Sequence, residues 1–183
     1  YAYARLRFPG KAATFYLVTV SRLIPAVALA IPYFLIVQQL GLLDRHLALI
    51  LVHTVLTLPF TILILTLYMR TIPREIEEAA QIDGASRGMV LRTMVLPLAL
   101  PSLVGTGLFA FMTSYSEFLF ALLVATSAYS RTLPVALASI SRNPDVTWSL
   151  LSAGTTLAIL PALLLVWPIW RYMVRGLVSG STG

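Results

Sequence analysis

Four long runs without a formally charged residue constrain this chain more than any other feature. They cover residues 23–43, 46–69, 93–116 and 146–170. A helix advances about 1.5 Å per residue, so about 20 apolar residues cross the roughly 30 Å hydrocarbon core of a bilayer. Because 58% of the 183 residues are hydrophobic and only 11% are charged, we expect an all-α, polytopic transmembrane helix bundle and not a water-soluble core.

Proline is frequent inside the expected spans, which we place at roughly residues 14–38, 46–69, 96–124 and 148–171. The prolines stand at positions 25, 32, 59, 97, 101, 161 and 168. Each one removes a backbone donor and tends to kink its helix, which a membrane tolerates only where neighbours or water satisfy the freed carbonyl. Both a moving bundle that lines a cavity and an ordinary packing adjustment fit this pattern.

The positive charges predict the orientation of the bundle. Nine Lys and Arg residues fall in the N-terminal segment, the loop after the second span and the tail: Arg5, Arg7, Lys11, Arg70, Arg74, Arg87, Arg92, Arg171 and Arg175. The other loops hold Arg45, Arg131 and Arg142. Because the side rich in Lys and Arg faces the cytoplasm, we expect residues 71–95 there, with Asp44 and residues 127–145 outside. The net charge of +6 is thus assigned to the membrane topology and not to nucleic acid.

The start of the chain and its cysteine count set two further expectations. The opening residues, YAYARLRFPGK, lack a starting Met and the charge order of a signal peptide. We therefore expect the chain to be truncated at its N-terminus. The chain has no cysteine, so neither a disulfide framework nor a thiolate metal site is expected in it.

One polar stretch, residues 73–88, carries four of the seven acidic residues of the chain. Its pattern predicts a helix from Pro73 to about Ile82, since proline suits the first turn and acids are favoured at the N-terminal end of the helix dipole. Gly84 is expected to end this helix in a left-handed conformation, and Ser86 to cap the next one. A narrow apolar stripe is predicted at Ile72, Ile76, Ala79 and Ala80. Two interpretations fit, a solvated linker and a helix that docks against another protein.

The stretch also carries a motif. Glu78, Ala79 and Ala80 are followed after three residues by Gly84 and after nine more by the run MVLP at 94–97. This spacing closely resembles the EAA signature of bacterial ABC-importer permeases, E-A-A-x3-G-x9-I-x-L-P, with Met94 in place of the usual Ile.

The resemblance extends over nearly all of the chain. The segment LIPAVALAIPYFLIVQQLGLLD is similar to the third helix and outer loop of the sugar-importing, maltose-transporter-type branch. The opening residues resemble the end of the second helix of that branch, and WRYMVRGLVSGSTG resembles its C-terminus. Family members normally have six spans, so the resemblance implies about four spans here, plus the end of an earlier one.

The resemblance implies a function for the whole chain. Residues 1–183 would form a permease domain in the inner membrane of a bacterium or archaeon, with a cytoplasmic coupling segment at about 71–95. This permease would import a sugar by alternating access, and an importer for another solute, such as an amino acid or phosphate, is the alternative. Its implied partners are a second permease subunit, a dimer of ATPase subunits that bind ATP and Mg, and an extracytoplasmic solute-binding protein. The residues assigned to ATPase coupling are Glu78, Ala79, Ala80, Asp83, Gly84, Leu96 and Pro97.

Other candidate sites are few. The sole lysine, Lys11, lacks the phosphate-binding motif around it, so no cofactor is expected on this chain. His46 and His53 do not form a convincing metal site, and we recognise no Ser with a His and Asp partner, which disfavours a membrane enzyme. Tyr115 and Glu117 stand where the family often has Trp and Glu. They are candidates for a substrate path or a helix contact.

Overall fold

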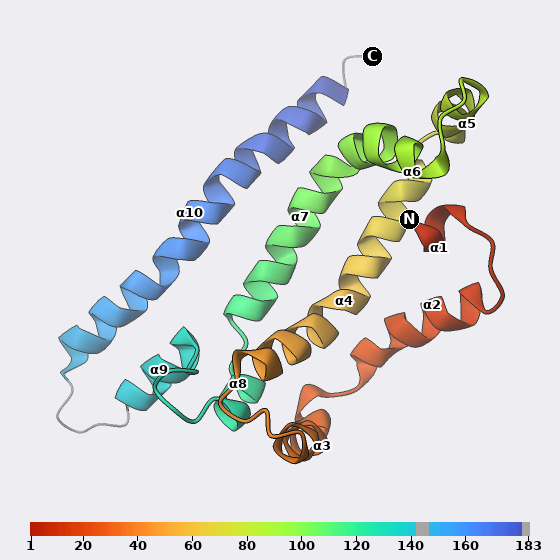
Figure 1. Ribbon diagram of the computed structural model, residues 1–183. Helices are drawn as coiled ribbons and strands as arrows, with labels where there is room; N and C mark the ends of the chain where they lie inside the picture. The colour runs from red at the N-terminus through yellow and green to blue at the C-terminus, as the bar shows by residue number, and fades with distance from the viewer. Residues whose placement is uncertain (142–146, 181–183) are drawn as a thin grey trace.

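The computed structural model describes residues 1–141 and 147–180, and these residues form helices joined by turns (Figure 1). This confirms the predicted all-α fold. Three helical stretches are long and apolar enough to cross a membrane: α4 (His46–Thr71), the run Arg87–Tyr115, and the part Trp148–Leu165 of α10 (Trp148–Gly180). A bent helix pair before α4 raises the number of spans to four if it is one span.

That bent pair contradicts the first predicted span. Residues 14–38 do not form one helix, because α2 (Lys11–Val20), followed by the short turn Ser21–Leu23, meets α3 (Ala26–Gln39) at an angle of 102°. The cause is Pro25, since a residue before proline is disfavoured in the helical region. Ile24 accordingly lies at φ −71° and ψ 123°, in extended backbone.

The second predicted span, 46–69, is confirmed by α4. The third is wrong at its C-terminal limit. A continuous helical run made of α6 (Arg87–Val90), a π turn (Leu91–Val95) and α7 (Leu96–Tyr115) ends nine residues before the predicted limit at 124.

The early end of α7 has a local cause at Glu117. Its carboxylate accepts hydrogen bonds from the N–H groups of Phe120 at 2.9 Å and Ala121 at 3.0 Å. These are free donors at the start of a new short helix, α8 (Leu119–Val124). The acid therefore begins a second helix where the sequence suggested a continuous one.

The last helices of the chain are α9 (Leu133–Ile140) and α10. The short helix α9 lies within the stretch predicted as an external loop. Arg142 and Asp145 of that loop fall outside the described residues. The start of α10 at Trp148 agrees with the fourth predicted span, and the helix continues beyond the expected end at 171.

The helices α4, α7 and α10 lie side by side, with α7 in the middle (Figure 1). One end of this layer carries α1 (Ala2–Arg5), α5 (Arg74–Ile82) and α6, and the opposite end carries α3, α8 and α9. The two groups of loops predicted to face opposite sides of the membrane therefore lie at opposite ends.

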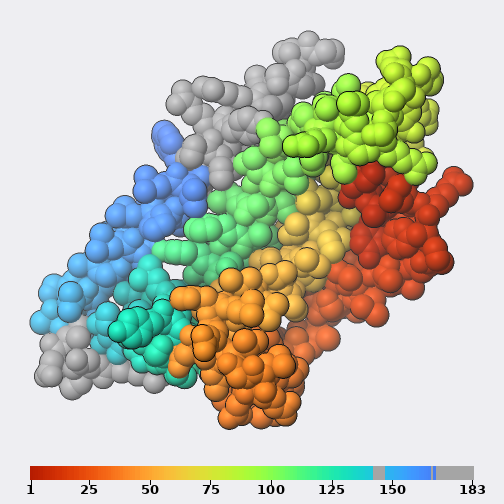
Figure 2. Space-filling model, viewed as in Figure 1, coloured from red at the N-terminus to blue at the C-terminus, as the bar shows by residue number. Residues whose placement is uncertain are grey.

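Each end has its own apolar core. Val37, Leu49, Val124 and Val135 pack together at the α3 end, and Met69, Ile72 and Val90 pack at the α5 end. Between these cores the long helices lie side by side, as Figure 2 shows. Only 22% of the membrane-spanning window of α4 is buried, and none of that of α10. These apolar faces are therefore left for lipid or for other chains.

Candidate functional site

The segment predicted for coupling, residues 71–95, folds locally as its pattern predicts. Helix α5 follows Pro73 and ends at Ile82, and Gly84 then takes φ +89°, in the left-handed region that favours glycine. The Ser86 side chain accepts a hydrogen bond from the N–H of Met89 at 3.3 Å and so caps α6. The segment is a compact helix, turn and helix between two long apolar helices.

Most of the residues assigned to coupling lie on the surface. Ala80 is half-buried against the core at this end, and the others are exposed: Glu78, Ala79, Asp83, Gly84, Leu96 and Pro97. The first five residues of the set lie together on α5 and its terminal turn, whereas Leu96 and Pro97 lie apart at the start of α7. Four large apolar side chains are also exposed on this segment, and the two most exposed are Ile82 at 86% and Met89 at 57%.

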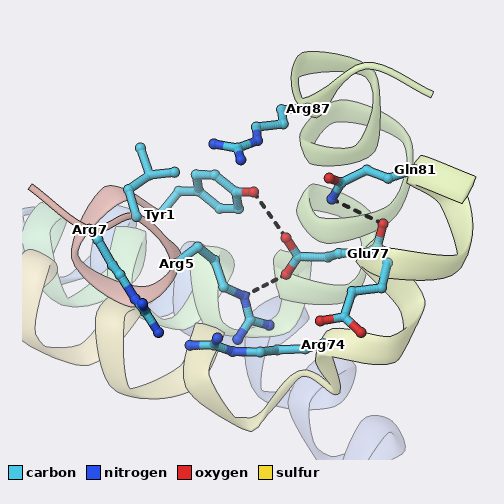
Figure 3. Close-up of a pocket in the computed structure, with 9 residues that line it drawn as sticks. Tyr1, Arg5, Arg7, Arg74, Glu77, Gln81 and Arg87 are labelled. Atoms are coloured by element: carbon cyan, nitrogen blue, oxygen red, sulfur yellow. Dashed lines mark hydrogen bonds and ion pairs between the residues drawn. The ribbon is translucent and has the colours of Figure 1, made fainter. Parts of the chain in front are cut away.

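Glu77 is the functional feature that the sequence reasoning missed. Its side chain is buried, and its carboxylate lies 2.5 Å from Nε of Arg5 and accepts a hydrogen bond from the Tyr1 hydroxyl at 2.9 Å (Figure 3). Arg5 also donates through Nη2 to the carbonyl of Ile72 at 2.6 Å. This ion pair ties the N-terminal segment to the first turn of α5 and to the end of α4.

The ion pair also corrects the predicted apolar stripe. Ile72 is buried and Ala80 half-buried as expected, but Ile76 and Ala79 are exposed. Because Glu77 takes the inward position, α5 is rotated so that those two residues face outward. One sequence signal could have indicated that Glu77 faces inward. Glu77 and Ala80 lie three residues apart, so they share a helix face.

A cavity of about 560 Å³ lies beside this ion pair, and its walls carry more positively than negatively charged side chains (Figure 3). Four arginines and two glutamates line it: Arg5, Arg7, Arg74, Arg87, Glu77 and Glu78. Gln81, at its edge, donates from its side-chain amide to the carbonyl of Glu77. The exposed surface of α5 is therefore bordered by arginines that can form charged contacts with a protein partner.

A second polar cluster lies between α4 and the end of α7. Nδ1 of His53 is 2.7 Å from Oγ of Ser114, and Nε2 of His53 is 3.6 Å from Oε2 of Glu117. The sequence patterns did not predict this set of a serine, a histidine and a glutamate, in which residues 61 positions apart in the chain meet. The 3.6 Å separation is too long for a hydrogen bond, so the set lacks the second bond of a hydrolytic triad.

The geometry defines how this cluster presents hydrogen-bonding groups. A proton on Nε2 of a neutral His53 faces the Glu117 carboxylate, whereas a bare nitrogen there would be repelled by it. Nδ1 then accepts from the Ser114 hydroxyl. The oxygen of Ser114 keeps its lone pairs for another donor, such as the hydroxyl of a ligand.

Two cavities adjoin the cluster and share His53 and Ser114 as wall residues. The larger, about 560 Å³, is also lined by His46, Thr54 and Thr57. The smaller, about 260 Å³, is completed by Phe111, Tyr115, Thr132, Leu133 and Pro134. Among the described residues, two buried side-chain polar atoms lack a hydrogen-bond partner, Nε2 of His53 and Oγ1 of Thr132. Both residues line the smaller cavity, although these two atoms are themselves buried.

Tyr115 and Glu117 are both helix contacts and neighbours of this cavity. The ring of Tyr115 stacks on Phe111 with centroids 5.4 Å apart, and its hydroxyl donates to the carbonyl of Ala158 in α10 at 2.8 Å. Glu117 joins the start of α8 to His53. The structure thus places Tyr115 in the wall of the smaller cavity and Glu117 behind it.

Comparison with known proteins gives one family and many relatives. The family of binding-protein-dependent transport system inner membrane components matches residues 1–177. The inner membrane ABC transporter permease protein YcjP of Escherichia coli is 35% identical over 99% of this chain and 65% of its own length. The trehalose/maltose transport system permease protein MalG of Thermococcus litoralis is 32% identical over 99% of this chain. The maltodextrin transport system permease protein MdxG of Bacillus subtilis is 31% identical over all of it. The chain spans about two thirds of the length of these relatives.

Proposed function

The chain belongs to the family of binding-protein-dependent transport system inner membrane components, and from this premise we propose that it forms most of the permease subunit of an ATP-driven sugar importer. Family membership confirms the resemblance predicted from the EAA spacing, and it makes the chain an inner-membrane protein. The permease carries the solute, and a separate ATPase dimer with its ATP and Mg supplies the energy. A second permease subunit and an extracytoplasmic solute-binding protein complete the proposed assembly.

The coupling segment is the observation that carries this proposal. It is fixed to the bundle on one face by the Arg5–Glu77 pair, and on the other face it exposes Glu78, Ile82 and Met89. Apolar side chains exposed on a polar segment favour a protein partner over free solvation. Closure of the ATPase dimer would then move α4 and α7 together and switch the access of the cavity.

A sugar is the substrate class that the described cavities suit best. Their walls carry hydroxyl and imidazole groups with a stacked aromatic pair, and they contain no Arg or Lys. Neutral hydroxyl-rich ligands use such groups, whereas a phosphate or carboxylate favours a cation. Two of the relatives are named for trehalose, maltose or maltodextrin transport. We place the substrate path beside Tyr115 and Glu117.

Co-purification tests the coupling assignment. Tagged full-length subunit should capture the ATPase, and Glu78→Lys should abolish capture by reversing a charge on the exposed face of α5. The matched control is Arg45→Glu, a charge reversal at an exposed position at the opposite end of α4, which should leave capture unchanged. Unchanged capture and transport in Glu78→Lys would overturn the assignment. Uptake of maltose or trehalose against phosphate and amino acids, measured in vesicles with the complete transporter, separates the sugar proposal from its alternative.

A further inference from the structure

The side chain of Asp44 organises the outer end of the chain. Its carboxylate accepts four hydrogen bonds of 2.7 Å, from the N–H and hydroxyl of Thr126, the N–H of Ser127 and the hydroxyl of Ser130. The N–H of Asp44 donates to the carbonyl of Val124, the last residue of α8, at 2.9 Å. Asp44 therefore holds α8 and the turn that follows it from both sides.

The backbone of Asp44 is adapted to these contacts. It takes φ +59°, and it is the one residue other than glycine with positive φ among those described. This left-handed conformation is costly for most side chains but accessible to Asp and Asn. The surrounding bonds therefore stabilise an unfavourable backbone at the point where residues 40–45 turn into α4.

The turn held by Asp44 leads directly into a wall of the smaller cavity. Ser130 is buried at 3% exposure, and two residues later Thr132 begins the wall that Leu133 and Pro134 continue. The carboxylate of Asp44 thus sets the position from which Thr132 faces His53 and Ser114 across the cavity.

Asp44 also lies at one end of a stiff connection. Helix α4 starts two residues later at His46 and continues through Pro59 to Thr71. At its other end, the carbonyl of Ile72 is bonded to Arg5, which pairs with Glu77 of α5. A single helix therefore joins the coupling segment to the residue that holds the cavity wall.

We propose that Asp44 is a positioning residue that makes the turn 125–132 and α9 move with α4, so that movement of the coupling segment displaces the cavity wall at Thr132. This inference rests on the proposed import function and adds a transmission element to it. The apolar cluster of Val37, Leu49, Val124 and Val135 also holds this end together. Such contacts are non-directional, so they keep the end folded while the carboxylate fixes the position of the turn.

Asp44→Asn tests the proposal in the full-length subunit within its assembled transporter. Asn tolerates positive φ, so the substitution removes the charge and part of the acceptor capacity without changing the backbone preference. We expect ATP hydrolysis to continue while sugar uptake per ATP hydrolysed falls about tenfold, within the usual range of coupling between sites. Thr126→Val removes one hydroxyl contact and should give an intermediate loss.

A distance measurement separates positioning from simple stabilisation. Spin labels at Leu47→Cys on α4 and Tyr129→Cys on the turn occupy exposed positions, 50% and 94% exposed, in a chain that contributes no cysteine of its own. The distance between them should stay single and constant through the ATP cycle, and should broaden or shift in Asp44→Asn.

Each outcome decides the proposal. An unchanged distance distribution in Asp44→Asn, or a parallel fall of hydrolysis and uptake, would overturn it. If Asp44→Asn does not assemble, Thr126→Val and Ser130→Ala take its place in both measurements with the same criteria. Absence of ATP-driven uptake in the unsubstituted transporter would instead reject the import function, and the label distances would still report on Asp44.

Discussion

Arg5 and Glu77 are in contact at 2.5 Å although 72 positions separate them in the chain. Their side chains are 7% and 8% exposed, so the pair is shielded from water. It fixes one face of helix α5 to the bundle and leaves the other face exposed. Docking of that exposed face against another protein stays a prediction.

Glu77→Gln should strongly destabilise the end of the bundle that carries α5. Removing one partner of a buried ion pair leaves Arg5 unpaired and costs about 3–5 kcal/mol. Thermal unfolding of the full-length subunit in detergent should show a lower midpoint. Glu78→Gln, at an exposed position of the same helix, should leave the midpoint nearly unchanged, and equal effects of the two variants would contradict the burial of Glu77.

Gly84→Ala should strain the turn between α5 and α6. Nothing lies within 4 Å of a Cβ added there, so the strain comes from φ +89° alone. The free energy of unfolding should fall by about 1–2 kcal/mol. Hydrogen exchange of the amides in residues 74–90 should become faster. Gly88→Ala is the matched control, because a Cβ added at Gly88 also meets nothing within 4 Å. Gly88 lies in a helix, where alanine is favoured over glycine by about 1 kcal/mol. Faster exchange in both variants would exclude the turn as the cause.

The stability of the end of the bundle that carries α3 and α8 should depend on acid pH through Asp44. Hydrogen bonds from the Ser127 backbone and the Thr126 and Ser130 side chains lower the pKa of this carboxyl well below its ordinary value of 3.8. A depressed pKa stabilises the folded state above the unfolded pKa, and this stabilisation is lost as pH falls through the folded pKa. Thermal midpoints of the natural protein and of Asp44→Asn should therefore differ by a constant amount above pH 3.8 and converge below it. A difference that is independent of pH down to strong acid would show that the charge plays no part.

Ser114→Ala should raise the KM of uptake and leave the assembly intact. The substitution removes one hydrogen-bond acceptor for the substrate. A net loss of 0.5–1.5 kcal/mol in the binding free energy of the substrate corresponds to about a 2- to 10-fold higher KM. Ser116→Ala is the control, since its exposed hydroxyl bonds only to the Met112 carbonyl. A similar KM change in the two variants would remove Ser114 from the substrate path.

Tyr115→Phe tests separately the two roles of Tyr115, its contact with α10 and its place in the cavity wall. The phenylalanine keeps the ring that stacks on Phe111 but loses the hydroxyl bonded to Ala158. Stability should fall by about 1 kcal/mol, whereas the KM of uptake should stay the same. A higher KM at unchanged stability would assign the hydroxyl to the substrate instead.

Local chemistry explains what the sequence could predict. Three features could be predicted from the sequence: the limits of α4, the turn at Gly84 and the cap at Ser86. Each depends on residues within one or two helical turns. The end of α7 was missed because Glu117 was treated as a residue within a span, although an acid can also satisfy the free N–H groups of a new helix. The break at Pro25 was visible as a proline, but its 102° angle depends on packing beyond the local pattern.

The site itself was less predictable for a physical reason. Glu77 and Arg5, His53 and Ser114, and Asp44 and Thr126 each meet across 61 or more positions. No spacing rule connects such pairs in a single sequence. The motif marked residues 71–95 as the predicted coupling segment, but only the fold shows which of its acids faces inward.

The helical run Arg87–Tyr115 has a mechanical consequence. At about 1.5 Å per residue its 29 residues extend about 43 Å, well beyond a hydrocarbon core of about 30 Å. One continuous helical run therefore joins the capped turn at Ser86 to the neighbourhood of Ser114, and it includes the π turn Leu91–Val95 and Pro101. We expect a displacement of that turn to travel along helical backbone, with bending concentrated at the π turn and at Pro101.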